Sequence, residues 1–170
     1  TETDFNGNPR YIMAELSQRT LNATIRLDYN INPNLTIQYY GQPFISRGIY
    51  KSFNRVTNPT AEYYGDRVAL FQPNQIGFVA SENGYRVDED NDGTTDYTFE
   101  NPDFSQVSFN SNLVVRWEYI PGSEIFLVWS QGIFGNANTR DDLFSGINDQ
   151  IFNRKPENIF LIKATYRFVL

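Results

Sequence analysis

The sequence contains no cysteine and no histidine, and these two absences exclude several kinds of chemistry. Without Cys the chain has no disulfide framework, no zinc ribbon and no iron–sulfur cluster. Without His it has no Ser-His-Asp or Cys-His catalysis and no imidazole metal site. We therefore expect no catalytic residues in this chain, and we look for its function in its architecture.

Positive charge is also scarce, with 14 Lys and Arg against 20 Asp and Glu and a formal net charge of -6. Because phosphate groups need a basic surface, this balance argues against a nucleic-acid partner. The acidity is concentrated between Ser81 and Phe104, where eight acids face Arg86 alone. That segment carries -7, so the rest of the chain carries +1.

Long hydrophobic runs are missing as well, and none approaches the roughly 18 residues of a membrane helix. A membrane is not excluded by this, because the strands of a transmembrane barrel alternate apolar and polar residues. The sequence shows no initiator Met and no signal-peptide core, which predicts a processed chain or part of a longer one. Its 170 residues are enough for one domain with a core.

The strongest positive signal is strict alternation of apolar and polar residues, the pattern of a half-buried strand. From Thr20 to Ile31 the odd positions are apolar and the even positions are polar. A turn at Asn32-Pro33-Asn34 follows, and the next strand continues the pattern. A three-residue loop there predicts the pairs Ile31–Leu35 and Tyr29–Ile37, with one apolar face.

A second hairpin has the same design, with strands over 106–119 and 124–131 around a turn at Pro121-Gly122. The sequence alone does not decide which residues of the return strand lie on the apolar face. A two-residue loop predicts Phe126 and Val128 on the apolar face. A three-residue loop predicts Ile125, Leu127 and Trp129 there instead. We favour the second arrangement by analogy with the first hairpin.

Two further strands, over 10–17 and 158–170, bring the expected number to about six. The connections are unequal, because two turns are tight whereas 45–104 and 133–157 are expected to be long loops. Short strands over 66–71 and 75–80 are candidates within the first loop. A short helix over 141–152 is a candidate within the second, with four apolar residues on one face.

Tight turns at one end, long loops at the other and long alternating strands predict an all-β, antiparallel, up-and-down transmembrane β-barrel. Aromatic residues gather near the tight-turn end, as in an interfacial girdle: Tyr29, Trp117, Tyr119, Tyr166 and Phe168. A soluble β-sandwich is the alternative, since its strands also alternate. Six strands fall short of the roughly eight of the smallest barrels. The chain is therefore expected to form the C-terminal strands of a larger barrel, unless a strand pair lies hidden within 45–83.

One motif carries recognisable metal chemistry, in the acidic segment 88–96. The segment matches the opening of a calcium loop. It has carboxylates at positions 1, 3, 5 and 9, Gly at position 6 and a backbone carbonyl at position 7. The predicted ligands are Asp88, Asp90, Asp92, Thr94 and Asp96, and the predicted cofactor is Ca²⁺. Position 12 departs from the pattern, because it is Phe99, with Glu100 one residue later. The alternative is a solvated acidic loop.

The polar face of the strands supplies six charged residues that would point into a barrel lumen: Arg26, Asp28, Arg116, Glu118, Lys163 and Arg167. They would either line a path for solutes or form salt bridges across the lumen. Aromatic residues of the first long loop could stack on sugars or pack that loop against the mouth of the barrel.

The end of the chain resembles the terminal β-signal that the barrel-assembly machinery reads. Apolar residues alternate back from the C-terminus and end in Tyr166, Phe168 and Leu170, although Phe is the commoner last residue. The resemblance implies an outer-membrane protein whose C-terminus is periplasmic.

Five segments resemble one family of large Bacteroidetes-type outer-membrane proteins: 14–20, 34–44, 101–104, 111–119 and 158–163. In that family a carbohydrate-binding module of the family-9 type precedes a C-terminal β-barrel domain of unassigned function. The resemblance implies that such a module lies upstream of this chain. It carries over no catalytic motif.

The expected function is a non-enzymatic outer-membrane barrel of a Gram-negative bacterium, which binds or passes a ligand such as a glycan or serves in an envelope assembly. Its expected partners are outer-membrane lipid, the assembly machinery and other envelope components, with the long loops extracellular. Two alternatives stay open. One is an outer-membrane hydrolase whose catalytic residues lie outside this chain, and the other is a soluble, secreted, calcium-binding β domain.

Overall fold

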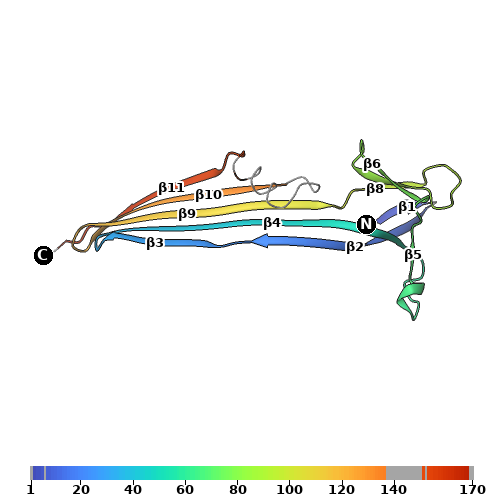
Figure 1. The fold of residues 1–170 in the computed structure, drawn as a ribbon, viewed down its shortest axis with the longest axis horizontal. Helices are drawn as coiled ribbons and strands as arrows, with labels where there is room; N and C mark the ends of the chain where they lie inside the picture. The colour runs from blue at the N-terminus through green and yellow to red at the C-terminus, as the bar shows by residue number, and fades with distance from the viewer. Residues whose placement is uncertain (1, 6, 137–150, 152, 169–170) are drawn as a thin grey trace. The chain divides into compact units, whose positions relative to one another are not determined.

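Antiparallel strands make up nearly all the regular structure of this chain (Figure 1). The computed structural model describes residues 2–5, 7–136, 151 and 153–168. The elements, in chain order, are β1 (Glu2–Phe5), β2 (Asn8–Asn22), β3 (Ile25–Asn32), β4 (Leu35–Val56), the 3₁₀ turn η1 (Tyr64–Asp66), β5 (Val68–Leu70), β6 (Ile76–Val79), β7 (Gly84–Val87), β8 (Tyr97–Glu100), β9 (Phe104–Ile120), β10 (Ser123–Asn136) and β11 (Glu157–Ala164). The predicted all-β, antiparallel class is confirmed.

The chain divides into two units, which we describe separately. Unit 1 comprises Thr1–Gln18 and Gly48–Asp103, and unit 2 comprises Arg19–Arg47 and Phe104–Leu170. The larger sheet has the order β1-β2-β4-β9-β10-β11, with β3 and β5 also paired to β4. The smaller sheet, β6-β7-β8, belongs to unit 1. Neither sheet closes into a barrel among the described residues.

The first hairpin of unit 2 has the predicted faces but a shorter turn than predicted. Tyr29 pairs with Ile37, as expected, whereas Leu35 pairs with Asn32 rather than with Ile31. The register shifts between Asn30 and Asn32, so Ile31 is the extra residue of a β-bulge. A two-residue turn with a bulge therefore replaces the expected three-residue loop.

The second hairpin repeats this arrangement, and its register shows which residues of β10 lie on the apolar face. Ser123 pairs with Ile120 across a two-residue turn, and a register shift at Ser123/Glu124 follows. Beyond that shift, Ile125, Leu127 and Trp129 pair with Trp117, Val115 and Leu113. The preferred phase is thus confirmed, although the bulge rather than the length of the turn produces it.

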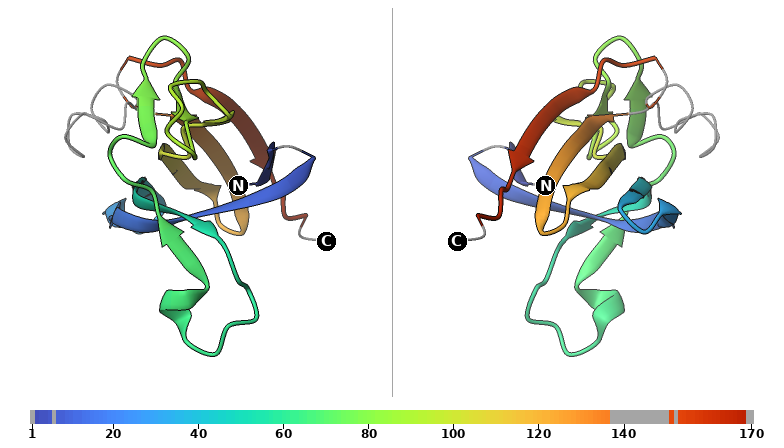
Figure 2. Two further views of the ribbon diagram at one scale, coloured as in Figure 1. Left: turned by 90° about the vertical axis from the view of Figure 1, so that its right-hand side faces the viewer. Right: turned by 90° about the vertical axis from the view of Figure 1, so that its left-hand side faces the viewer.

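The expected first strand is not a separate strand of the sheet. β2 has 15 residues and covers the predicted strand over 10–17 together with the start of the one over 20–31. After a break at Ala23 and Thr24, β3 continues along the same partner, β4. A backbone hydrogen bond of 3.1 Å from Ala23 N to Pro43 O bridges the break. The six predicted strands therefore correspond to five long stretches of strand: β2 with β3, β4, β9, β10 and β11. Figure 2 shows the last two, β10 and β11, side by side at one edge.

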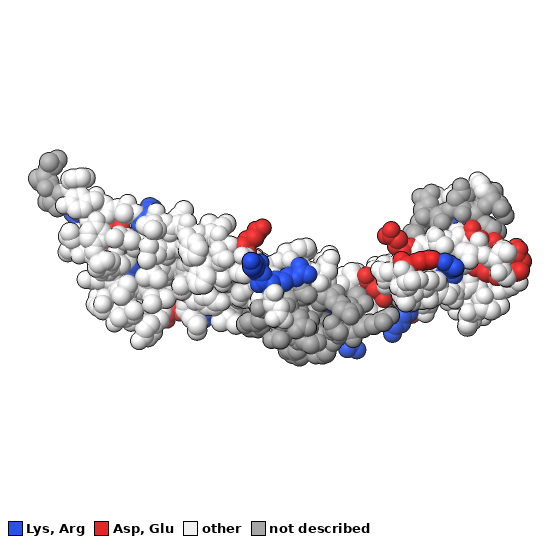
Figure 3. Space-filling view, turned by 90° about the horizontal axis from the view of Figure 1, so that it is seen from above, with Lys and Arg blue, Asp and Glu red and all other residues white. Residues whose placement is uncertain are grey.

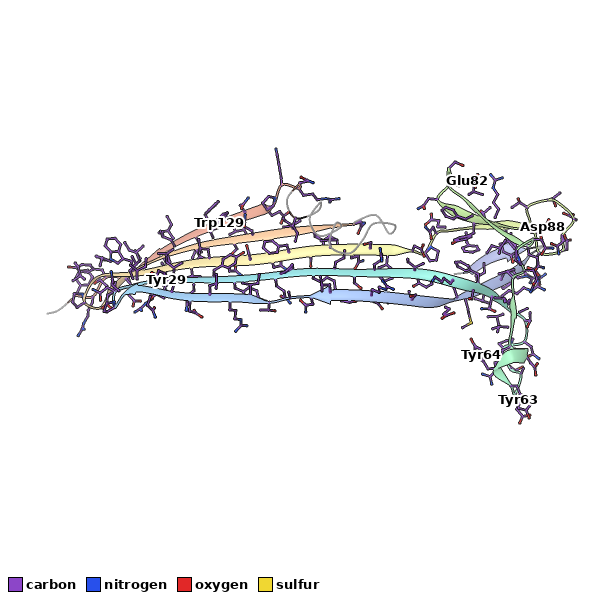
Figure 4. All side chains as sticks on the ribbon, in the orientation of Figure 1. Tyr29, Tyr63, Tyr64, Glu82, Asp88 and Trp129 are labelled. Carbon is purple, nitrogen blue, oxygen red and sulfur yellow. The ribbon has the colours of Figure 1, made fainter. Side chains whose placement is uncertain are left out.

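Unit 1 contains the segment that the sequence pattern predicted to be one long loop. Its first residues extend β4 to Val56, and four short strands and η1 follow. β5 and β6 confirm the two candidate strands at 66–71 and 75–80. Figure 4 shows Tyr63 and Tyr64 at the tip of the connection between β4 and β5.

The apolar core of unit 1 explains why this segment folds. Side chains from β2, β4, β7 and β8, together with one that follows β5, form one buried cluster: Ile12, Phe53, Phe71, Val87, Tyr97 and Phe99. Phe53 lies against both Tyr85 and Phe99, with ring centroids 4.7 and 5.3 Å apart. Burial of these aromatic side chains supplies the driving force that short strands lack on their own.

The end of the chain differs from the expected strand over 158–170. β11 ends at Ala164, and one further pair of hydrogen bonds joins Thr165 to Glu124. The helix expected over 141–152 falls outside the described residues except for Ile151. No helix within the described part of the chain is long and apolar enough to cross a membrane.

Gly122 is the residue on which the second turn depends, because it has a φ of +80°. A Cβ at this position would also lie 2.6 Å from Arg167 Cδ. We predict that Gly122→Ala lowers the free energy of unfolding by about 1–2 kcal/mol, the cost of left-handed backbone with a side chain. Urea denaturation measures this change.

The matched control is Gly132→Ala in the same hairpin, where an added Cβ would meet only Asn110 Oδ1 at 3.8 Å. Alanine there is expected to be neutral or slightly stabilising, because Gly weakens a strand. Equal losses in the two variants would contradict the role assigned to the turn.

Candidate metal centre and sheet faces

The acidic loop, residues 88–96, connects β7 to β8 in unit 1, and Figure 4 labels Asp88 at its start. The loop is closed at its base, where Asp96 N donates to Val87 O at 2.8 Å. Glu89 N donates to Asp96 Oδ2 at 2.6 Å. Asn91 and Gly93 have φ values of +61° and +91°, so the chain reverses sharply at these residues.

Three carboxylates of this loop come together, those of Asp88, Asp90 and Asp96. One oxygen from each lies within 4.8 Å of the others, and this group could hold a metal ion. Asp88 also accepts hydrogen bonds from Asp92 N at 3.1 Å and Gly93 N at 2.9 Å. These amides fix the first carboxylate in place and offset part of its negative charge.

Asp92, another predicted ligand, does not join this group of carboxylates, and Thr94, which would bind through its backbone carbonyl, stays a prediction. Asp92 Oδ1 accepts hydrogen bonds from Thr94 N at 2.8 Å and from Thr94 Oγ1 at 2.6 Å. The side-chain hydrogen bond from Thr94, followed by the backbone one, holds the pKa of Asp92 below its usual value. Position 12 of the calcium pattern, Phe99, is buried in the core of unit 1 and supplies no ligand.

Glu89 anchors the loop to the rest of unit 1, and its side chain is only 11% exposed. Its carboxylate pairs with Arg10 of β2 at 3.2 Å and with Arg55 of β4 at 2.5 Å. Tyr97 Oη donates a third bond at 2.8 Å, and Gln75 Nε2 donates to the Glu89 carbonyl at 2.7 Å. Glu89 thus joins the loop to β2 and β4, whereas Asp90 is exposed and Asp88 and Asp96 are half-buried.

No pattern in the sequence predicted this role for Glu89. Its cationic partners lie 79 and 34 positions away along the chain, beyond the reach of any local pattern. Figure 3 shows many acidic side chains gathered within unit 1. Glu89 differs from most of them because its charge is neutralised by close cations.

Unit 2 presents one apolar face, built from odd-numbered positions of β3, β4, β9 and β10 and even-numbered positions of β11. Directly paired residues share a face, so the register defines its members. Many of its side chains are exposed: Ile25, Leu27, Tyr29, Trp117, Leu127, Trp129, Phe160 and Ile162. Trp129 stacks on Phe160 with ring centroids 5.7 Å apart, and Figure 4 labels Tyr29 and Trp129.

The opposite face of unit 2 is more polar, and it carries most of the charged residues predicted for a lumen. Asp28 accepts a hydrogen bond of 2.9 Å from Gln38, and Arg26 lies over the ring of Tyr40. Arg116 forms an ion pair with Glu124, and Lys163 lies over the ring of Phe126. Each contact joins neighbouring strands.

Two predicted lumen residues lie close to the turn after β9. Glu118 Oε1 accepts a hydrogen bond of 2.7 Å from Gly122 N, and Arg167 N donates to Ser123 Oγ at 3.0 Å. None of the six predicted lumen residues forms an ion pair with another of the six in the described part of the chain.

Four of the five aromatic residues predicted for a girdle are exposed, and Tyr119 is half-buried. Trp117 and Tyr119 lie 6.1 Å apart, and Tyr166 and Phe168 lie 4.8 Å apart, both in edge-to-face contact. Tyr166 and Phe168 of the suggested β-signal are 59% and 82% exposed. Leu170, the last residue of that signal, lies outside the described residues.

The chain belongs to the family described as "Domain of unknown function (DUF5916)", whose profile matches residues 3–169. No curated protein and no solved structure matches the chain. Family membership therefore covers both units, and it assigns no activity to either.

Tyr97 links the stability of unit 1 to pH. Burial, followed by the hydrogen bond to Glu89, raises the pKa of Tyr97 above its ordinary value of 10.0. The folded chain therefore keeps a proton that the unfolded chain releases above about pH 10. We predict that the free energy of unfolding falls as pH rises above 10, and that Tyr97→Phe makes this fall shallower.

The measurement is urea denaturation at a series of pH values, with Tyr64→Phe as the control because Tyr64 is 65% exposed. In Tyr97→Phe the free energy of unfolding still falls somewhat with rising pH, because burial also raises the pKa of Tyr85. If Tyr97→Phe and Tyr64→Phe have the same pH dependence, Tyr97 is not the responsible group.

Proposed function

We propose that this chain forms part of the wall of an outer-membrane β-barrel and that it is not an enzyme. The unit 2 strands would be the membrane-spanning segments, with the two tight turns and the C-terminus on the periplasmic side. Residues 48–103 would lie on the cell exterior.

The observation that carries this proposal is the apolar face of unit 2. Large apolar side chains there are exposed on neighbouring strands, including Leu27 at 60%, Trp117 at 50% and Ile162 at 74%. A soluble domain rarely leaves a contiguous surface of this kind uncovered. Hydrocarbon chains of lipid would remove these side chains from water without any partner protein.

Three further features support a barrel wall. β4, β9 and β10 have 22, 17 and 14 residues, which exceeds the roughly 9–11 residues that cross a bilayer. The face opposite the apolar one is polar enough to be wet. β3 and β11 pair on one side only among the described strands, and an edge in lipid needs a partner. Further strands of a larger barrel would supply that pairing.

The resemblance to outer-membrane proteins that carry a carbohydrate-binding module suggests the biological setting. A sugar module upstream would place glycans near the exterior loops, so the barrel would bind or pass a glycan-related ligand or serve in an envelope assembly. The exposed, aromatic C-terminal segment, with Tyr166 and Phe168, would be read by the barrel-assembly machinery.

For the acidic loop we propose Ca²⁺ as the ion. Oxygen-only ligands from Asp88, Asp90 and Asp96 suit a hard cation, and three close carboxylates repel one another without one. Glu89 would keep the loop on unit 1 whether or not the ion is bound. The site would be weak, as in extracellular calcium modules.

Val114 and Val115 offer a direct test of the membrane face, because they are adjacent in β9 and lie on opposite faces. Val115 pairs with Leu127 on the apolar face, and Val114 pairs with Val128 on the polar face. We predict that Val115→Arg lowers the free energy of unfolding in lipid by about 2–4 kcal/mol. Val114→Arg is expected to cost under about 1 kcal/mol, because the polar face is wet in the proposal.

The measurement is the folded fraction in lipid vesicles across a urea series, read from the mobility of unheated samples in SDS gels. The wild-type protein is expected to migrate differently before and after heating. A protein that is soluble without detergent and shows no heat-dependent shift would contradict the barrel, as would equal costs for the two arginine variants.

For the metal, calorimetry with Ca²⁺ compares the wild type with the double variant Asp90→Asn, Asp96→Asn. We predict that the double variant loses Ca²⁺ binding, because two of the three clustered carboxylates are gone. Asp66→Asn is the control, since Asp66 lies in η1, away from the loop in sequence. Unchanged Ca²⁺ binding by the double variant would remove the loop as the site.

A further inference from the structure

Unit 2 contains a pocket of about 560 Å³ on its polar face. Its floor is formed by β9 and β10, from which Ser108, Asn110, Gly132 and Phe134 line it. Ser108 pairs with Phe134 and Asn110 pairs with Gly132, so these four residues share one face of the sheet. One wall comes from Arg154 and Lys155, which precede β11, and from Glu157, its first residue.

The two cations of this wall are the main feature of the pocket. Arg154 and Lys155 are exposed, and neither forms an ion pair or hydrogen bond with any other residue that the structure describes. Elsewhere in unit 2, Arg116 and Lys163 are held by a carboxylate or an aromatic ring. Among the described residues, no carboxylate competes with an anion for Arg154 and Lys155.

The floor of the pocket suits a ligand with hydroxyl groups. Ser108 and Asn110 offer neutral donors and acceptors, and Glu157 adds a carboxylate that can accept hydrogen bonds from hydroxyls. Gly132 leaves space beside them, since an added Cβ would have only Asn110 Oδ1 within 4 Å. Phe134, 70% exposed, presents a large apolar surface to the same pocket.

The pocket also continues along the polar face. A neighbouring hollow of about 210 Å³ shares Asn110, Gly132 and Glu157 with it. A third hollow, of about 270 Å³, shares Asn112 with the second and reaches Arg26 and Asp28. Neutral amides and hydroxyls thus connect the cationic wall to the residues predicted to line a lumen.

We propose that the pocket binds a small hydroxylated anion, with Arg154 and Lys155 holding its carboxylate or phosphate group. This inference rests on the proposed function, in which the polar face is the water-filled side of the barrel. To that proposal it adds the chemical class of the solute that the barrel would bind. A neutral solute would leave both cations unused, and a ligand without hydroxyl groups would leave the amides unused.

The test is calorimetric titration of the protein in detergent micelles with glucose 6-phosphate, glucuronate and glucose. Glucose 6-phosphate or glucuronate is expected to bind, and the stronger of the two identifies phosphate or carboxylate as the preferred group. Glucose is expected to bind at least tenfold more weakly. In Arg154→Gln, Lys155→Gln the anion should bind at least tenfold more weakly than in the wild type.

The matched control is Arg19→Gln, Lys51→Gln, which removes the same charge from two exposed cations outside the pocket and should bind as the wild type does. Gly132→Val, which fills the pocket with a residue that strands favour, should also abolish binding. Equal anion affinity in the wild type, the Arg154/Lys155 variant and the Gly132 variant overturns the site, as does equal affinity for glucose.

The heat-dependent gel shift of the same samples separates the two proposals. A wild type that shows the shift and binds no anion keeps the barrel and overturns the anion site. A wild-type protein that lacks the shift overturns the barrel. The anion site is still supported in that case if the wild type binds the anion and the Arg154/Lys155 and Gly132 variants do not.

Discussion

The register of the antiparallel strands is the constraint on which the rest of unit 2 depends, because a slip of one residue moves every side chain of a strand to the opposite face. Each hairpin combines a two-residue turn with a single extra residue, Ile31 in the first and Tyr119 in the second. The first bulge places Tyr29 opposite Ile37 and the second places Leu127 opposite Val115. Both bring the apolar positions of neighbouring strands to one face. The polar positions, and with them the pocket before β11, fall on the other face for the same reason.

Unit 1 is organised differently, around an apolar cluster and one largely buried carboxylate, that of Glu89. Its strands are too short to be stable as isolated hairpins, so they depend on packing against β2 and β4. Glu89 connects Arg10, Arg55 and Tyr97, and truncating it would remove the carboxylate that these two partly buried cations share. The clustered carboxylates of Asp88, Asp90 and Asp96 thereby have a fixed base, with Asp90 exposed and the other two half-buried. A cation site can form there with little further ordering of the loop.

Much of the fold could be predicted from the sequence because alternation is a local property of a strand. The strands around Pro33 and Pro121, the antiparallel class and the apolar face were all predicted in this way. The continuity of β2 with β3 was not, since nothing local reveals that two runs follow the same partner strand. The acidic motif predicted the right loop, but Asp92 turned out to pair with Thr94 instead of joining the carboxylate group. Hydrogen bonding within a loop competes with ligand geometry, and sequence spacing does not decide between them.

The sequence by itself determined which residues alternate, where the chain turns and where the negative charge gathers, because these depend on neighbours along the chain. Only the tertiary structure decided that Glu89 meets Arg10 and Arg55, that β5 to β8 form within the supposed loop, and that Arg154 and Lys155 line one pocket. Those contacts join residues far apart in the sequence. Their free energy comes from burial and electrostatics that exist only after the strands have paired.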